Sequence, residues 1–554
     1  MRRAILIAAT LFLAIAVAYG RPVAPPASVG PEGASPVWNS PDETANVFWA
    51  SRVAAGEPLR YVDSIVELGA GAVHPRSMGV AGDALVPGSF PGIILLYGVL
   101  KFLFRLPFFL YTPILTAIAG LCFAALVARL FDRKTGLVAA VLFFLHPAVL
   151  YYGARGMFHN MLFIDALVVA AALFALRPLR AYFGAREAAD DVLGGFILAW
   201  ALVVRTSEAV WVLPAFAAFL PFAGKERWKR LAFAALGGLV PLVILLRINA
   251  TLYGSPFRTA YAPPPPASVV EAEIDAAAPE ETATQAAPAA LLPFGLHPKL
   301  AARNVWNYGL KLFWWQSLLA AAGFVWWALR FRKATSAQKM YALAALLTAA
   351  WLALLYGSWL IRDRFDFTQV TIGTSYVRYF LPAYVAAAPF AAFALVRIGG
   401  RLGKPRLVPA VLVLCAVLGI RAAVFAGDES LRAVRATLEG NAEKKTALLA
   451  LFEPSAVVMT ERFDKLLVPE RLRVIPATDA GAFEAAALAA EYVPVYWYGL
   501  RPEGDEAGRL YELAGAYGLV FREIANPAPG EAVYRLDWFA EDATYDLETD
   551  PQDE

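Results

Sequence analysis

Two adjacent carboxylates, Asp42 and Glu43, are the residues best suited by type and position to do chemistry. They follow Ser40 and Pro41 and precede the run 44–50. A carboxylate held in place can take a proton from a hydroxyl and so act as a general base. The same tetrapeptide also starts helices, because Ser or Asp caps the first turn and Pro fits its first position. The sequence alone supports both interpretations.

Arginine supplies a second set of candidates. Its planar fork can bond two phosphate oxygens at once. These arginines fall on the side of the chain where a membrane protein carries few basic residues. Snorkelling to lipid headgroups is the simpler explanation for many of them, and Arg205 can instead pair with nearby Glu208. The candidates for contact with a phosphate are Arg155, Arg205, Arg364 and Arg378, together with Tyr379.

Three further residues, His159, Asn160 and His74, are candidates either for metal ligands or for orienting hydrogen-bond partners. The next carboxylate after Asn160 is Asp165, which falls one or two turns into the following helix. A histidine in a loop is more often structural than a ligand. The pattern therefore assigns no cofactor and leaves the participation of a divalent metal ion open.

Membrane-spanning helices must position these residues. The chain has 554 residues, of which 59% are hydrophobic and only 17% charged. The net charge of +3 is too nearly balanced to indicate a nucleic-acid partner. Both cysteines, Cys122 and Cys415, lie inside apolar runs, which favours packing over a disulfide or a metal site. We therefore expect an α-helical polytopic membrane protein.

About eleven apolar segments predict transmembrane helices, since roughly 20 residues cross the hydrocarbon and polar flanks can extend shorter runs. The first segment follows Arg2 and Arg3 and is either a signal peptide or, as we expect, a retained helix. The segments are 4–18, 109–130, 137–151, 161–176, 192–204, 210–222, 231–246, 310–329, 341–356, 379–396 and 407–425.

Basic clusters occur in every second connecting loop, which predicts that those loops and the N-terminus are cytoplasmic. The protein is then an inner-membrane protein whose residues 426–554 are outside the cytoplasm. The segment 91–104 begins at Pro91, follows Pro87 and holds Lys101, and counting it as a span would invert every later loop. We expect it to lie in the interface as a helix on the outer leaflet.

Three regions outside the membrane are long. Residues 21–108 form the first outer loop of a membrane module that covers 1–425. A Pro, Ala and Glu-rich stretch near 262–290 has the composition of a disordered segment. Residues 426–540 alternate short β-like runs with helical ones, which predicts a small α/β domain, and 541–554 is an acidic tail. The expected strands are 456–459, 473–475, 493–498, 519–523 and 533–536.

With these motifs in this order, the chain resembles the type C glycosyltransferases. The resemblance is to the branch that contains the protein O-mannosyltransferases and the lipid A aminoarabinose transferase, and it covers most of 1–425. The motifs that carry it are Asp42-Glu43 in the first outer loop, His74-Pro75, the segment from Pro91, the basic turn 129–137, the run 225–229 and the run 378–382.

The resemblance implies a polyprenyl-phosphate-linked sugar donor and a lipid, glycan or protein acceptor outside the cytoplasm. It also implies that Asp42 is the general base with Glu43 beside it, and that cations stabilise the departing phosphate. The chain departs from the family in its second outer loop, 155–160, where many relatives carry another acidic residue. A membrane transporter and a non-catalytic lipid-binding or glycan-binding protein are the alternatives from other classes.

Overall fold

The computed structural model describes residues 2–26, 34–69, 71–179, 188–219, 224–261, 292–363, 368–404, 406–479 and 481–538. The segment 262–290 expected to be disordered, the tail 541–554 and Arg364 lie outside the described residues. The chain divides into two compact units. A helical unit comprises Met1–Arg21, Val53–Gly56 and Phe90–Ala436, and a second unit comprises Pro22–Arg52, Glu57–Ser89 and Thr437–Glu554.

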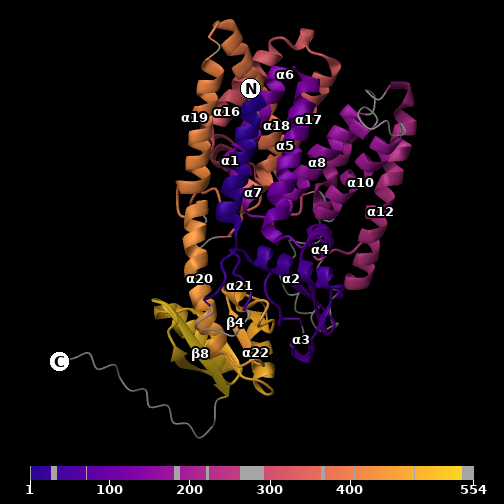
Figure 1. Ribbon diagram of the computed structural model, residues 1–554. Helices are drawn as coiled ribbons and strands as arrows, with labels where there is room; N and C mark the ends of the chain where they lie inside the picture. The colour runs from indigo at the N-terminus through magenta and orange to yellow at the C-terminus, as the bar shows by residue number, and fades with distance from the viewer. Residues whose placement is uncertain are drawn as a thin grey trace, which may run out of the picture. The chain divides into compact units, whose positions relative to one another are not determined.

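Long apolar helices build the helical unit (Figure 1). Seven helices among the described residues are long and apolar enough to cross a membrane, and two bent pairs raise the number to at most nine. The first pair turns by 53° between α6 and α7, and the second by 115° between α10 and α11. The helices are α1 (Arg2–Gly20), α4 (Gly92–Phe104), α5 (Tyr111–Leu130), α6 (Arg133–Phe144), α7 (Pro147–Ala154), α8 (His159–Leu176), α10 (Ala189–Val204), α11 (Ala209–Ala217), α12 (Arg227–Tyr253), α15 (Pro298–Asn304), α16 (Trp314–Ala328), α17 (Ser336–Leu355), α18 (Ser375–Arg401) and α19 (Leu407–Ile420).

Within the described residues, every expected apolar segment overlaps one or more of these helices, which confirms the polytopic helical fold. The number eleven stays a prediction. It requires α11, with 9 residues, and α16, with 15 residues, each to span alone, although about 20 residues cross the hydrocarbon. The segment expected at the interface is α4, a 13-residue helix.

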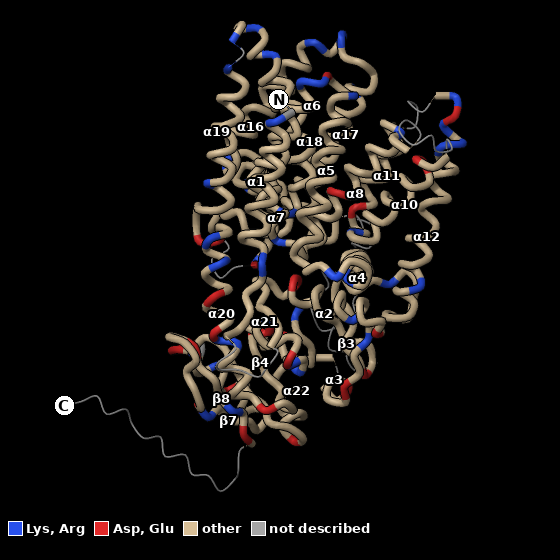
Figure 2. The backbone as a smooth tube through the Cα atoms, viewed as in Figure 1, with Lys and Arg blue, Asp and Glu red and all other residues tan. Residues whose placement is uncertain are grey.

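Basic loop residues gather at one end of the helical unit, together with the N-terminus (Figure 2). They come from the α5–α6 turn, the start of α12, the α16–α17 connection and the α18–α19 connection. This grouping agrees with the expected alternation of the loops, because four connections far apart in sequence share one end. The side of the membrane on which that end lies remains a prediction.

Helices α10 and α12 cross with direct contact between their backbones. A side chain at Gly195 would lie 1.9 Å from the carbonyl oxygen of Ala234, and one at Gly237 would lie 1.9 Å from that of Val192. Close approach at small residues is a common way for membrane helices to gain van der Waals contact. These two glycines therefore determine the spacing of α10 and α12.

Two sheets form the framework of the second unit. The first is antiparallel and holds β1 (Tyr61–Val62), β3 (Ala84–Pro87) and β2 (Met78–Ala81) in that order. The second is mixed: β5, β4 and β6 are parallel, whereas β6, β8 and β7 are antiparallel. In spatial order its strands are β5 (Val474–Pro476), β4 (Val457–Thr460), β6 (Val495–Leu500), β8 (Glu531–Trp538) and β7 (Leu519–Ala525).

Five strands at the expected places confirm the small α/β fold near the C-terminus. Its helices are α20 (Leu431–Leu451), α21 (Asp464–Leu467), α22 (Ala482–Ala490) and α23 (Gly504–Ala516). Residues of the first loop contribute α2 (Pro41–Ala55) and α3 (Ser64–Leu68) and pack with this domain in one compact unit. About 350 residues of sequence separate the two parts of this unit, and no pattern in the sequence predicted that they would share it.

Candidate functional site

Asp42 is the second residue of α2, which begins at Pro41. The helix is capped by Ser40: its hydroxyl oxygen accepts the Asp42 N–H at 3.2 Å, and its carbonyl oxygen accepts the Thr44 N–H at 3.1 Å. The helix start therefore does not use the Asp42 side chain as its cap. Glu43 points into the unit and is 3% exposed, whereas Asp42 is half-buried.

The Asp42 carboxylate accepts a hydrogen bond from the Ser77 hydroxyl at 2.6 Å. Ser77 has a φ of 62°, a left-handed conformation that is uncommon for residues other than glycine. Strain of this kind persists only where the surroundings hold the backbone, and it concentrates at functional sites. Asp42 also lies in the first turn of α2, where the helix dipole favours a negative charge.

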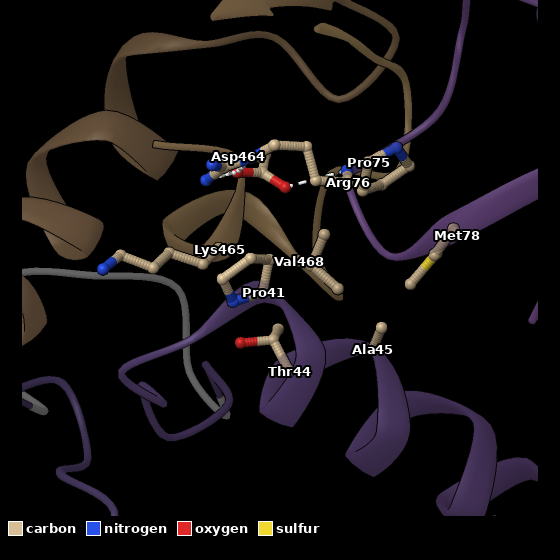
Figure 3. A pocket seen from close by; sticks show the side chains of 9 residues that line it. All are labelled: Pro41, Thr44, Ala45, Pro75, Arg76, Met78, Asp464, Lys465 and Val468. Carbon is tan, nitrogen blue, oxygen red and sulfur yellow. Dashed lines mark hydrogen bonds and ion pairs between the residues drawn. The ribbon is translucent and has the colours of Figure 1, made fainter. Parts of the chain in front are cut away.

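The residue next to Ser77 anchors this loop (Figure 3). Arg76 donates through Nε to the Asp464 carboxylate at 2.8 Å and through its main-chain N–H at 2.9 Å. The crevice around this pair is too narrow to admit a water molecule, so it is a packing contact and not a substrate pocket. Its lining residues are Pro41, Thr44, Ala45, Pro75, Arg76, Met78, Asp464, Lys465 and Val468.

His74 lies in the same loop and already has partners. Its Nε2 is 3.3 Å from the Asp479 carboxylate, and its Nδ1 is 3.1 Å from the carbonyl oxygen of Pro75. These contacts favour the structural interpretation of this histidine over a role as a metal ligand.

In the helical unit, two candidate arginines lie against one aromatic ring. The guanidinium carbon of Arg155, just after α7, is 4.6 Å from the ring centre of Phe158. That of Arg378, in the first turn of α18, is 5.0 Å from the same centre. Arg155 is 8% exposed and also donates to the Tyr151 hydroxyl at 3.2 Å. Two guanidinium groups beside one ring concentrate positive charge, which suits this position to an anion.

His159 and Asn160, at the start of α8, orient main-chain groups around this ring. The buried amide of Asn160 donates to the main-chain carbonyl of Arg378 at 3.1 Å. His159 places Nε2 3.0 Å from the carbonyl oxygen of Phe90, a contact that makes Nε2 the protonated nitrogen. We name the group of Arg155, Phe158, Asn160 and Arg378 the arginine–phenylalanine cluster.

Arg205 forms the internal pair that the sequence offered as an alternative. At the break between α10 and α11, its guanidinium donates to Glu208 at 2.6 Å and to the Tyr356 hydroxyl at 2.9 Å. Because its charge is paired with that of Glu208, Arg205 is less available to a phosphate. It lies over the ring of Tyr379, 5.1 Å from its centre, and Tyr379 stacks on Tyr356 at 4.3 Å.

The ring stack around Tyr379 was not predicted from the sequence. Trp359 lies 5.9 Å from Tyr379 and stacks on Phe294 at 4.2 Å. Of its residues only Tyr379 was a candidate from the sequence, as a phosphate contact, and the spacing of these aromatic residues along the chain gives no indication of a stack.

The described residues do not offer a metal-ligand set, because no three His, Cys, Asp or Glu side chains among them are grouped to hold an ion. Asp42, His74 and His159 have the hydrogen-bond partners given above. We therefore derive no step through a metal ion.

Neither the known family models nor the curated proteins contain a match to this sequence. Solved structures do resemble it. The oligosaccharyltransferase of Archaeoglobus fulgidus tethered with an acceptor peptide gives a TM-score of 0.52 at 14% identity, over 96% of this chain and 74% of that one. The enzyme AglB from the same organism, in complex with an inhibitory peptide and a dolichol-phosphate, gives 0.50 at 14% identity, over 99% and 75%.

The chain has the type C glycosyltransferase fold. This confirms the resemblance read from the motifs at the level of the fold, which is all that such identities establish. ArnT from Cupriavidus metallidurans bound to undecaprenyl phosphate has a TM-score of 0.44 at 14% identity, over 95% of this chain and 97% of that one. The branch within the type C enzymes stays a prediction.

Proposed function

We propose that this chain is a membrane glycosyltransferase that moves a sugar from a polyprenyl-phosphate-linked donor to an acceptor hydroxyl outside the cytoplasm. The arginine–phenylalanine cluster carries the proposal. It puts two guanidinium groups beside one ring in a largely apolar helical unit, where charged side chains are rare and usually functional or mutually paired. The fold agrees, since a structure with the same fold was solved with a dolichol-phosphate.

On the donor side, the arginines bind the phosphate that leaves. As the bond between the sugar carbon and the phosphate oxygen breaks, its electron pair stays on that oxygen and negative charge grows there. Arg378 bonds two phosphate oxygens with its fork, and Arg155 adds a second positive charge. Asn160 holds the main chain of Arg378 and so fixes where the fork can reach. Stabilising charge as it develops lowers the barrier to transfer.

On the acceptor side, Asp42 receives the proton. The acceptor oxygen forms a bond to the sugar carbon, and its hydrogen passes to the Asp42 carboxylate. The Ser77 hydroxyl bonds one carboxylate oxygen and so sets the orientation of the group. The Arg76–Asp464 pair holds the loop that carries Ser77. Glu43 is buried beside Asp42 and has a supporting role.

Incubation of the purified full-length chain with radiolabelled polyprenyl-phosphate sugars tests the proposal. The donors are undecaprenyl-phosphate-linked hexose, pentose and aminoarabinose, each with a membrane extract as the source of acceptor. We expect at least one donor to be cleaved, with release of undecaprenyl phosphate and transfer of the label. Uptake of label into vesicles without cleavage would show a transporter. Binding without cleavage of any donor would show a binding protein, and either result contradicts the proposal.

A further inference from the structure

Tyr152, in α7, is a buried residue with no role so far, and its side chain is 1% exposed. Its hydroxyl is 3.0 Å from the main-chain carbonyl oxygen of Thr374 and 3.2 Å from that of Ile372. A carbonyl oxygen can only accept, so the hydroxyl donates and the two oxygens share its proton. The partners are 220 and 222 residues away in the sequence, so no local motif could indicate this contact.

The segment that accepts this hydrogen bond leads directly into α18. Thr374 is the N-cap of that helix, and Arg378 follows in its first turn. The Thr374 carbonyl oxygen also accepts the Val377 N–H at 3.1 Å, which closes the first turn. The position of Thr374 therefore determines where the main chain of Arg378 lies, and Tyr152 holds Thr374 in place.

The other end of the hydrogen bond belongs to the element that carries the second arginine. Arg155 is the C-cap of α7, the helix that contains Tyr152. The Tyr152 ring also packs edge-on against Phe158, with the ring centres 5.9 Å apart. Phe158 is the ring beside which both guanidinium groups lie. One hydroxyl thus joins the helix that ends at Arg155 to the segment that leads to Arg378.

Asn160 holds the same arginine from a different element. Its amide bonds the main-chain carbonyl of Arg378 from α8. Tyr152 acts from α7, so its hydrogen bonds directly relate the two elements that carry the arginines. Two guanidinium groups serve one phosphate only where their N–H donors converge on its oxygens. The separation of α7 from the start of α18 is therefore a property on which phosphate binding depends.

We propose that Tyr152 is a positioning residue for the donor phosphate, whose hydroxyl fixes the Arg378 guanidinium relative to that of Arg155. The inference rests on the proposed function, because it takes the arginine–phenylalanine cluster as the phosphate site. Tyr152 acts through the two arginines and does not contact the phosphate. Removal of its hydroxyl should weaken recognition of the phosphate and leave recognition of the isoprenoid chain unchanged.

Tyr152→Phe tests the proposal, because it removes the hydroxyl and keeps the ring against Phe158. Dissociation constants are measured by native mass spectrometry on the purified full-length chain, with undecaprenyl phosphate and undecaprenol as probes that differ only in the phosphate. We expect the variant to bind undecaprenyl phosphate about three- to tenfold more weakly than the wild type, the range for loss of one net hydrogen bond. Its affinity for undecaprenol should equal that of the wild type. Equal weakening of both probes would show a purely structural role and overturn the proposal.

Tyr341→Phe is the matched control for loss of a tyrosine hydroxyl. The Tyr341 hydroxyl donates to the main-chain carbonyl oxygen of Ala386 at 2.7 Å, so it also bonds the backbone of α18. Ala386 lies about 12 Å further along that helix than Arg378. Tyr341→Phe should therefore bind both probes like the wild type. Weaker binding of undecaprenyl phosphate alone by this variant would mean that loss of a distant bond to α18 has the same effect, and would contradict the proposal.

Arg378→Ala distinguishes a failure of this inference from a failure of the proposed function. Arg378→Ala should weaken binding of undecaprenyl phosphate, and adding Tyr152→Phe should weaken it by less than about twofold more, because residues that act through one another are not additive. A fully additive effect would overturn the positioning role and leave the phosphate site in place. Wild-type affinity in Arg378→Ala itself would overturn the phosphate site and the inference together.

Discussion

At the scale of single residues, a substitution at Asp42 can distinguish a catalytic role of its carboxylate from a structural role. Asp42→Asn keeps the size of the side chain and can still accept the Ser77 hydroxyl through its amide oxygen, but it cannot take a proton. Because Ser40 caps α2, the substitution should leave folding intact. We expect sugar transfer to fall at least about a hundredfold, within the range of about 10²–10⁴ that general-base catalysis contributes. The measurement is kcat/KM together with the thermal unfolding of the purified variant.

A matched acid-to-amide change controls for charge in the same loop. Glu67, on α3, has an exposed side chain outside the proposed site, and Glu67→Gln should transfer sugar like the wild type. Glu43→Gln should fall by less than Asp42→Asn, because Glu43 is given only a supporting role. Full turnover by Asp42→Asn would show that Asp42 is not the general base.

Substitutions at Arg378 test its proposed contact with the donor phosphate. Arg378→Lys keeps the charge but loses the fork, whereas Arg378→Ala loses both. A hydrogen bond to a charged group is worth about 1.5–3 kcal/mol. We therefore expect kcat/KM for the donor to fall roughly tenfold in the Arg378→Lys variant and roughly a hundredfold in the Arg378→Ala variant. Arg303→Ala, at an exposed position of α15, serves as the control. Wild-type kinetics in Arg378→Ala would remove Arg378 from the site.

Residue types and their place in the topology named Asp42, Arg155, Asn160 and Arg378 as candidates, and their roles stay predictions. The contact between Asn160 and Arg378 joins positions 218 residues apart, so no local pattern could show it. Ser77 carried no signal either, because a serine in a polar loop is ordinary. Its role depends on a left-handed backbone that only the folded loop holds.

At the scale of elements, the crossing of α10 and α12 can be tested with two adjacent glycines. Gly237→Ala puts a methyl group 1.9 Å from the carbonyl oxygen of Val192, so the helices must move apart. Overpacking of this kind costs about 1–3 kcal/mol. Gly238→Ala meets nothing closer than 3.4 Å and gains helix propensity, so its stability should match or exceed that of the wild type. Thermal unfolding in detergent compares the two, and equal midpoints would contradict the close crossing.

Elements were the best-predicted level because hydrophobic pattern is a local property. The five strands near the C-terminus follow from short runs such as 493–498, where β-branched and aromatic residues gather. The bend of 115° after α10 was not predicted as such. At the bend Arg205 bonds Glu208 and Tyr356, and Tyr356, the residue that follows α17, is 151 residues further along the chain.

At the scale of the whole molecule, the side of the membrane on which each loop lies is the main open prediction. A reporter fused after Gly224 should be cytoplasmic, and one fused after Gly427 should be outside. Both glycines have positive φ and nothing within 4 Å of a built side chain, so a fusion there disturbs little. Alkaline phosphatase and green fluorescent protein fusions report the two sides. The same side for both would refute the predicted threading.

The shared unit of first loop and C-terminal domain has a consequence for how a cell makes this protein. Asp464 and Lys465, which bond Arg76 and the carbonyl oxygen of Asn39, are made long after the loop itself. About 350 residues separate Ser89 from Thr437, and a ribosome adds about 5–20 residues per second. For roughly 20–70 s the loop that carries Asp42 therefore exists without the C-terminal part of its unit, while the helices between them are synthesised and inserted into the bilayer. A chain stalled in that interval would carry the segment with the proposed base, but without the bonds to Asp464 and Lys465 that hold this loop in the complete protein.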